Sequence, residues 1–268
     1  MTMAVGTEVY NVDALPVKAR GLSYTDGELD AALRGSVSGI LWDEAGESEL
    51  QAVLSSMVTT EFSDKSVRRI LTGLPTPENW RVREALAEAF LVEHRKCEFP
   101  WPSGRDLRNP AASPTGTDLV GFQETETSAR THRFSFGEVK TSEQEAWPPT
   151  VMDGRHGLTK QLECLRDSTS AKDALVRYLG HHASHTSWFP RYQSATSRYL
   201  SDPCDVSLFG VIVRDVDPRS EDLVSRTVVL ASNCPASTSI ELFAMYLPKK
   251  SICTLSSRAT RLKEGKHG

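Results

Sequence analysis

The chain has 268 residues, of which 39% are hydrophobic and 25% are charged, and its formal net charge is -4. The length suits one large domain or two small ones, and the composition is typical of a globular protein. The negative charge argues against a stand-alone DNA-binding protein, whose affinity depends on phosphate contacts. It allows an enzyme with a local basic patch, or one to which a partner delivers DNA.

The sequence predicts neither a membrane protein nor a disulfide-bonded one. No apolar run approaches the length of a transmembrane helix, so no membrane association is expected. The five cysteines are scattered and form no Cys-x-x-Cys pair, which indicates neither a zinc site nor a disulfide framework. A reducing cytoplasm is therefore the expected location.

The first part of the chain is predicted to be mostly helical. Residues 1–75 are interpreted as an N-terminal helical elaboration and residues 76–268 as the core, the two packing as one compact unit. SGILWDEAG, around Trp42, predicts a short strand. Apolar residues recur at helical spacing in three later segments. These predicted helices are residues 47–58, 63–74 and 79–95.

The second part predicts a hairpin, a helical region and further strands. TDLVGFQ and HRFSFGEVKT read as two strands around a polar turn, after a loop at 99–116 that is rich in Pro, Gly and Ser. A helix at 158–183 is expected to break near Ser168, and the basic C-terminal tail is expected to fray. Further strands are predicted at 205–216, 225–232 and 239–247. This order favours an α/β fold with a mixed central sheet flanked by helices.

Acidic and basic residues on the hairpin form the strongest candidate site. Side chains alternate along a strand, so Glu138 and Lys140 point to one face and Val139 points to the other, toward a core. Hairpin pairing is expected to bring the Asp118 carboxylate near Glu138. Two adjacent carboxylates repel each other unless one is protonated or both bind a metal. An oxygen-rich pair favours a hard ion such as Mg²⁺ or Mn²⁺.

This combination of residues suits phosphodiester hydrolysis. A metal lowers the pKa of a bound water, and a neighbouring ammonium can orient that water and stabilise charge on the phosphate. The alternative is structural, because Glu-x-Lys is a common surface pair on any strand. The context favours a site: Gly116 and Gly121 flank Asp118 and allow close backbone approach, and Phe134 and Phe136 indicate a buried strand.

GTDLVGF followed by FGEVKTS resembles the core motif of the PD-(D/E)xK nuclease superfamily, an acid at a strand start followed by Glu-x-Lys on the neighbouring strand. The resemblance implies that Asp118 and Glu138 bind metal, that the Val139 carbonyl is an extra ligand, and that Lys140 positions the attacking water. Pro114 lies four residues before the aspartate rather than directly before it, which departs from the pattern.

Two flanking helices carry further residues that match this superfamily. Members often have a glutamate on a helix before the first core strand, and VREALAEAFL offers Glu84 or Glu88 as a metal ligand. Ordinary solvated helix glutamates are an equally good reading of these two positions. Some members have a glutamine on the helix after the lysine strand, which here is Gln161. A surface glutamine without a role is the alternative.

The layout is also similar to the DUF1837 family, the HamA-like nuclease subunits of the bacterial Hachiman anti-phage defence system. This similarity implies DNA as the substrate and a complex with a superfamily 2 helicase subunit (HamB-like) that senses DNA using ATP. One alternative is a non-catalytic scaffold or clamp that keeps the nuclease fold. A restriction-type endonuclease is a third reading, and the lack of a separate recognition domain counts against it.

Overall fold

The computed structural model describes residues 2–57, 65–67, 70, 76–102, 105, 116–125 and 131–265. A seven-stranded mixed sheet with helices on both faces confirms the predicted α/β fold. The strand order across the sheet is β1-β2-β7-β6-β5-β4-β3. The strands are β1 (Thr7–Asn11), β2 (Val17–Ser23), β3 (Cys97–Glu98), β4 (Leu119–Glu124), β5 (His132–Ser142), β6 (Val206–Arg214) and β7 (Ser239–Tyr246).

The centre of the sheet is parallel and its margins are antiparallel. Strands β2, β7, β6 and β5 run parallel, whereas β1, β4 and β3 are added antiparallel. Every residue of β6 is buried, which is typical of a parallel strand covered on both faces and explains its continuous apolar sequence.

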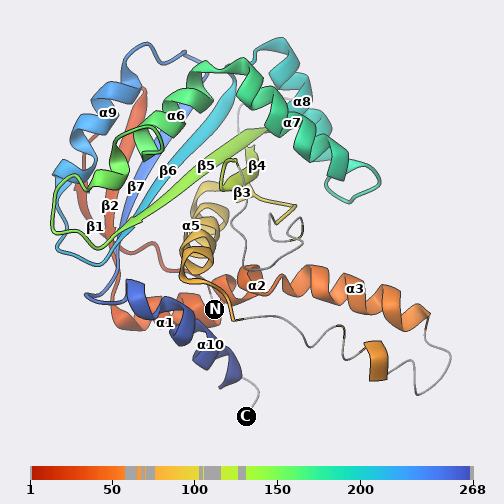
Figure 1. Cartoon of the computed structure of the whole chain (residues 1–268). Helices are drawn as coiled ribbons and strands as arrows, with labels where there is room; N and C mark the ends of the chain where they lie inside the picture. The colour runs from red at the N-terminus through yellow and green to blue at the C-terminus, as the bar shows by residue number, and fades with distance from the viewer. Residues whose placement is uncertain are drawn as a thin grey trace.

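Helices cover the two faces of the sheet unequally (Figure 1). Helices α6 to α9 lie on one face, and α5 lies on the other with α1 and α10 beneath it. None of the described helices is long and apolar enough to cross a membrane. The α-helices are α1 (Asp26–Arg34), α2 (Ser36–Leu41), α3 (Glu44–Ser56), α5 (Asn79–Arg95), α6 (Leu158–Asp167), α7 (Thr169–Ala183), α8 (Phe189–Ser201), α9 (Val224–Ala231) and α10 (Leu255–Glu264). Single 3₁₀ turns lie at Thr150–Met152, Ser220–Asp222 and Ile252–Thr254.

Helix α5 is the central helix of its layer and has the predicted bounds. Almost every residue from Val82 to Leu91 is buried, because α5 packs against the sheet on one side and against α2 and α10 on the other. A helix that is buried all round leaves no exposed face for charged residues. Any glutamate in this stretch is therefore buried with it.

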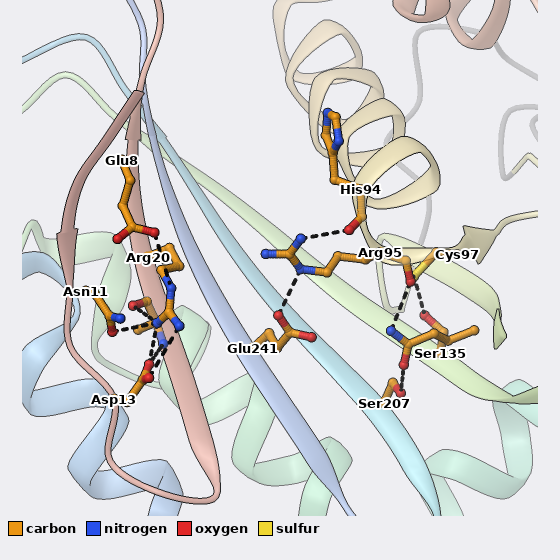
Figure 2. A network of polar contacts seen from close by, with 12 residues as sticks. Glu8, Asn11, Asp13, Arg20, His94, Arg95, Cys97, Ser135, Ser207 and Glu241 are labelled. Atoms are coloured by element: carbon orange, nitrogen blue, oxygen red, sulfur yellow. Dashed lines mark hydrogen bonds and ion pairs between the residues drawn. The ribbon is translucent and has the colours of Figure 1, made fainter. Parts of the chain in front are cut away.

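Polar contacts attach the C-terminal end of α5 to the sheet (Figure 2). The Arg95 Nε donates to Glu241 on β7 at 2.9 Å, and its guanidinium lies 4.8 Å from the centre of the Phe243 ring. Just beyond the helix, the Ser135 hydroxyl on β5 donates to the Cys97 sulfur at 3.8 Å.

Several predicted elements differ from the structure. The strand expected around Trp42 is wrong, because residues 36–41 form α2, which packs on α5. The strand expected at 225–232 is wrong as well, since α9 occupies it with Thr227 and Leu230 buried. The tail does not fray before residue 265, because α10 buries Leu255 and Ala259.

The helix predicted at 47–58 is confirmed as α3, whereas the helices α1 and α2 and the strands β1 and β2, which the N-terminal segment supplies to the sheet, were not predicted. The predicted helix at 63–74 falls outside the described residues except at 65–67 and 70. The expected break near Ser168 is confirmed, because this residue ends α6 and caps α7.

Candidate metal centre

The candidate site lies where β5 continues past the start of β4. The antiparallel pairing of these strands ends with Leu119 opposite Gly137, whereas β5 runs on to Ser142 with only β6 beside it. Asp118 directly precedes β4, so the register places it next to Glu138. The hairpin thus brings together the two acids that the sequence motif predicts.

Asp118 takes over the hydrogen bond that β4 no longer provides. Its Oδ2 accepts the Val139 backbone N–H at 2.7 Å. The N–H and C=O of one strand residue point toward the same neighbouring strand. The Val139 carbonyl is therefore directed to the same open edge as the Asp118 carboxylate, as a carbonyl ligand of an ion would be. The Val139 side chain is buried on the α5 face, as predicted.

Glu138 and Lys140 form an ion pair on the opposite face of β5. The Glu138 side chain is 3% exposed, and its Oε2 lies 3.5 Å from the Lys140 Nζ. Within the described residues this oxygen accepts no hydrogen bond. The Lys140 side chain is 22% exposed, so it is partly accessible while the Glu138 carboxylate stays buried. A buried carboxylate oxygen without a donor is an available ligand atom.

The two glutamates of α5 are buried, so their reading as solvated helix residues is wrong. Glu84 and Glu88 are each 7% exposed. Arg81, one turn earlier on the same helix, donates to the Glu84 Oε2 at 3.3 Å. Desolvation of a carboxylate is costly unless it is paired or protonated.

The electrostatics distinguish these two glutamates. Burial, with the Asp118 charge next in size, raises the pKa of Glu84 to about 8. Burial raises the pKa of Glu88 to about 7, and the carboxylate that adds to this effect is Asp43 at the start of α3. Of the two α5 glutamates, Glu84 is therefore the one whose pKa responds to the Asp118 charge, and it is the better candidate for a third ligand.

Burial raises the pKa of both hairpin acids. Burial raises the pKa of Glu138, the Asp118 charge adds to it, and the Lys140 ammonium opposes it. Burial also raises the pKa of Asp118, against the lowering effect of the hydrogen bond from Val139. Acids that repel one another in this way bind a cation in exchange for protons.

Hard oxygen donors at this edge fit a small divalent ion. Among the described residues, no three His, Cys, Asp or Glu side chains form a ready-made ligand cluster. An ion here would therefore be held by Asp118, Glu138 and the Val139 carbonyl, with Glu84 as the further candidate and water in the other positions. Mg²⁺ keeps several waters and binds through one or two carboxylates, so this donor set suits it.

Gln161 lies on the side of α6 that faces β5. Leu158, Leu162 and Leu165 of this helix are buried on the sheet. Arg166 marks one flank, because its guanidinium donates to the Leu230 carbonyl of α9 at 2.8 Å. Helical spacing puts Gln161 on the other flank, toward β5.

The Gln161 Oε1 is buried and has no hydrogen-bond partner among the described residues. Gln161 is therefore not an ordinary surface glutamine, because its side-chain oxygen is buried.

Sequence reasoning missed two arginines of α5 beside the acids. Arg81 pairs with Glu84 at a spacing of three residues, which is a recognisable helix pair. The Arg83 Nε is buried without a hydrogen-bond partner among the described residues, and Glu143 and Glu84 are the charges that act on it. No simple sequence signal separates Arg83 from a solvated helix arginine.

Comparisons with known proteins leave the family unassigned. A scan against protein-family models finds no match, and a search of the curated proteins finds no relative.

Proposed function

We propose that this chain is a metal-dependent deoxyribonuclease of the PD-(D/E)xK type. The observation that carries the proposal is the meeting of Asp118, Glu138 and Lys140 at one open strand edge. Two contacts support this arrangement: the 2.7 Å hydrogen bond from the Val139 N–H to Asp118 and the 3.5 Å ion pair between Glu138 and Lys140. Two carboxylates and a carbonyl supply ligands for Mg²⁺ or Mn²⁺, and the lysine supplies a cation for a phosphate group.

The residues of the site support in-line hydrolysis of a phosphodiester. The bound ion would lower the pKa of a water and offset charge on the phosphate. Lys140, whose side chain is partly exposed, orients the attacking water and donates to a phosphate oxygen. As the water oxygen bonds to phosphorus, it gives up a proton to solvent, and the bond from phosphorus to the leaving oxygen breaks. That oxygen takes up a proton from solvent.

We propose further that the enzyme is the effector subunit of a cytoplasmic anti-phage defence complex, regulated by a superfamily 2 helicase. This part rests on the resemblance of the motif and layout to the DUF1837 (HamA-like) family. The net charge of -4 is compatible with it, because a partner that binds DNA would supply most of the affinity.

The test uses the complex with its helicase partner and compares two double substitutions. Glu138→Gln/Lys140→Met removes the buried pair, and Lys160→Met/Glu163→Gln removes an ion pair of 3.0 Å on α6 as the control. Plasmid and linear DNA are incubated with Mg²⁺ or EDTA, with and without ATP. We expect cleavage by wild type and control only with Mg²⁺, and a loss of about 100-fold or more in the site variant. The folding of each protein is verified by circular dichroism. Cleavage that survives Glu138→Gln/Lys140→Met would exclude these residues as the nuclease centre.

A non-catalytic scaffold is the second candidate, and the ion pair itself favours it. A glutamate buried beside a lysine can be kept for packing alone. A wild-type complex that stays assembled and binds DNA, yet cuts nothing with either metal, would establish the scaffold.

A further inference from the structure

A groove lies between α3, the N-terminal end of α5 and the segment around Trp101. Its volume is about 550 Å³, and its lining includes Trp42, Trp80, Leu50 and Val53. Helix α3 extends away from the sheet beyond α2 (Figure 1). None of its residues is buried against the described part of the chain.

One side of α3 presents an exposed apolar stripe. Leu50, Val53 and Met57 are 43%, 52% and 68% exposed, and their spacing of three and four residues puts them on one face. The first two line the groove, so the stripe continues the apolar lining onto the open helix. Contiguous apolar surface of this kind, rimmed by polar residues, is typical of an interaction site.

The rim of the groove is acidic. Glu47, Glu49 and Glu78 line it, besides Asp43, which is paired with Arg105. Helix α3, EAGESELQAVLSS, carries three glutamates and no lysine or arginine. The rim therefore attracts a cationic ligand and repels an anionic one.

The two arginines of the lining are already paired. Arg105 makes two hydrogen bonds of 2.6 and 2.8 Å to the Asp43 carboxylate, and Arg81 donates to Glu84. Arg105 would have to break its pair to receive a phosphate, and Glu47, Glu49 and Glu78 outnumber Arg81 in the lining, so the groove does not fit a nucleic-acid strand.

We propose that this groove binds an amphipathic helix of a partner protein, with apolar residues on one face and lysines or arginines along its flanks. The apolar face would cover Leu50 and Val53, and the basic flanks would meet the acidic rim, a form of helix-in-groove recognition. A second copy of this chain fits less well, because two α3 helices placed face to face would oppose their glutamates. The proposal does not depend on nuclease activity.

The test titrates the full-length protein with synthetic helical peptides of about 18 residues, or five turns. One peptide has a leucine face with lysine flanks, a second has the same face with glutamate flanks, and a third has glutamine in place of leucine. Binding is followed by tryptophan fluorescence and by methyl signals of Leu50 and Val53. Leu50→Gln/Val53→Gln is compared with Val228→Gln/Val229→Gln, which alters two exposed valines of α9.

The proposal predicts that only the leucine–lysine peptide binds well. Leu50→Gln/Val53→Gln weakens binding by about tenfold or more, and the α9 control leaves it unchanged. Glu47→Lys/Glu49→Lys shifts preference to the leucine–glutamate peptide. Absence of binding up to about 1 mM, or equal binding by both double glutamine variants, overturns the proposal.

Two further outcomes assign the groove to another occupant and overturn the proposal as well. Dimerisation seen by sedimentation and abolished by Leu50→Gln/Val53→Gln would assign it to a second copy. Methyl contacts in the free monomer between Leu50 or Val53 and a distant part of this chain would show that it is filled from within.

Discussion

The metal-free protein should become less stable as the pH rises, and Glu84→Gln should remove much of that loss. Glu84 has a pKa of about 8 in the folded protein against 4.5 for the ordinary side chain, because it is buried near Asp118. Between these values the folded state keeps a proton that the unfolded state has released. The free energy of unfolding therefore falls with rising pH, by about 1.4 kcal/mol for each pH unit. Over the whole interval the contribution of this group is about 5 kcal/mol.

The variant replaces the carboxyl with a neutral amide of the same shape. Glu84→Gln should match wild type at pH 4.5 and should exceed it in stability by a few kcal/mol at pH 8, without metal. Glu163→Gln is the matched control, since it also removes a glutamate paired with a cation three residues earlier, but at a more exposed site. It should follow the wild-type profile.

The assay is urea unfolding with EDTA at pH 4.5 to 8.5, followed by circular dichroism. With a slope of about 1–3 kcal/mol per molar urea, the difference at pH 8 corresponds to a midpoint shift on the order of 2 M. Adding Mg²⁺ at pH 8 should raise the wild-type midpoint, because the ion binds only the folded state, and should raise that of Glu84→Gln less. Parallel pH profiles for wild type and Glu84→Gln would refute the electrostatic account of this cluster.

Three further substitutions test the site and the sheet. Asp118→Asn keeps an oxygen that accepts the Val139 N–H but loses the charge, so Mn²⁺ affinity measured by calorimetry should fall at least about tenfold while the melting temperature changes little. Gly121→Ala places a methyl group 2.0 Å from a carbonyl oxygen of β3, and differential scanning calorimetry should show destabilisation on the order of 2 kcal/mol or more. Arg214→Met leaves the fully buried Asp222 without its cation and should cost about 3–5 kcal/mol in chemical unfolding, whereas the double change with Asp222→Leu should recover part of it.

The elements that sequence periodicity predicted are those whose local pattern agrees with their packing. The stripe in 79–95 gives α5 with its bounds, and the alternation in 132–141 gives β5. Residues 225–232 were misread because a run of Thr and Val favours strands. In α9 the buried Thr227 and Leu230 decide the conformation, while Val228 is 61% exposed. Strand β2 pairs locally with β1, but its place inside the sheet depends on β7, more than 200 residues away.

Of the candidate site, too, one part could be predicted from the sequence and another part could not. Glu138 and Lys140 share a face because strands alternate, and the short polar turn between the predicted strands places Asp118 beside them. The choice between Glu84 and Glu88 needs the packing of α5, because only the three-dimensional arrangement shows which glutamate lies near Asp118. Helical periodicity found the apolar face of α3, but not that it is left open.

The strand pairing explains why polar groups are available to a ligand beside Val139. Along β6 and most of β5, neighbouring strands use the backbone groups on both sides, so no carbonyl there is available to a ligand. Beyond Leu119 the ladder of β4 stops, and Val139 directs both its N–H and its carbonyl to an edge without a strand. Asp118 satisfies the N–H and brings a charge, and the carbonyl is left beside that charge. Under the proposed function this edge would hold a cation rather than another strand, and Glu84 of α5, whose pKa responds to the Asp118 charge, is the further acid in the adjacent layer.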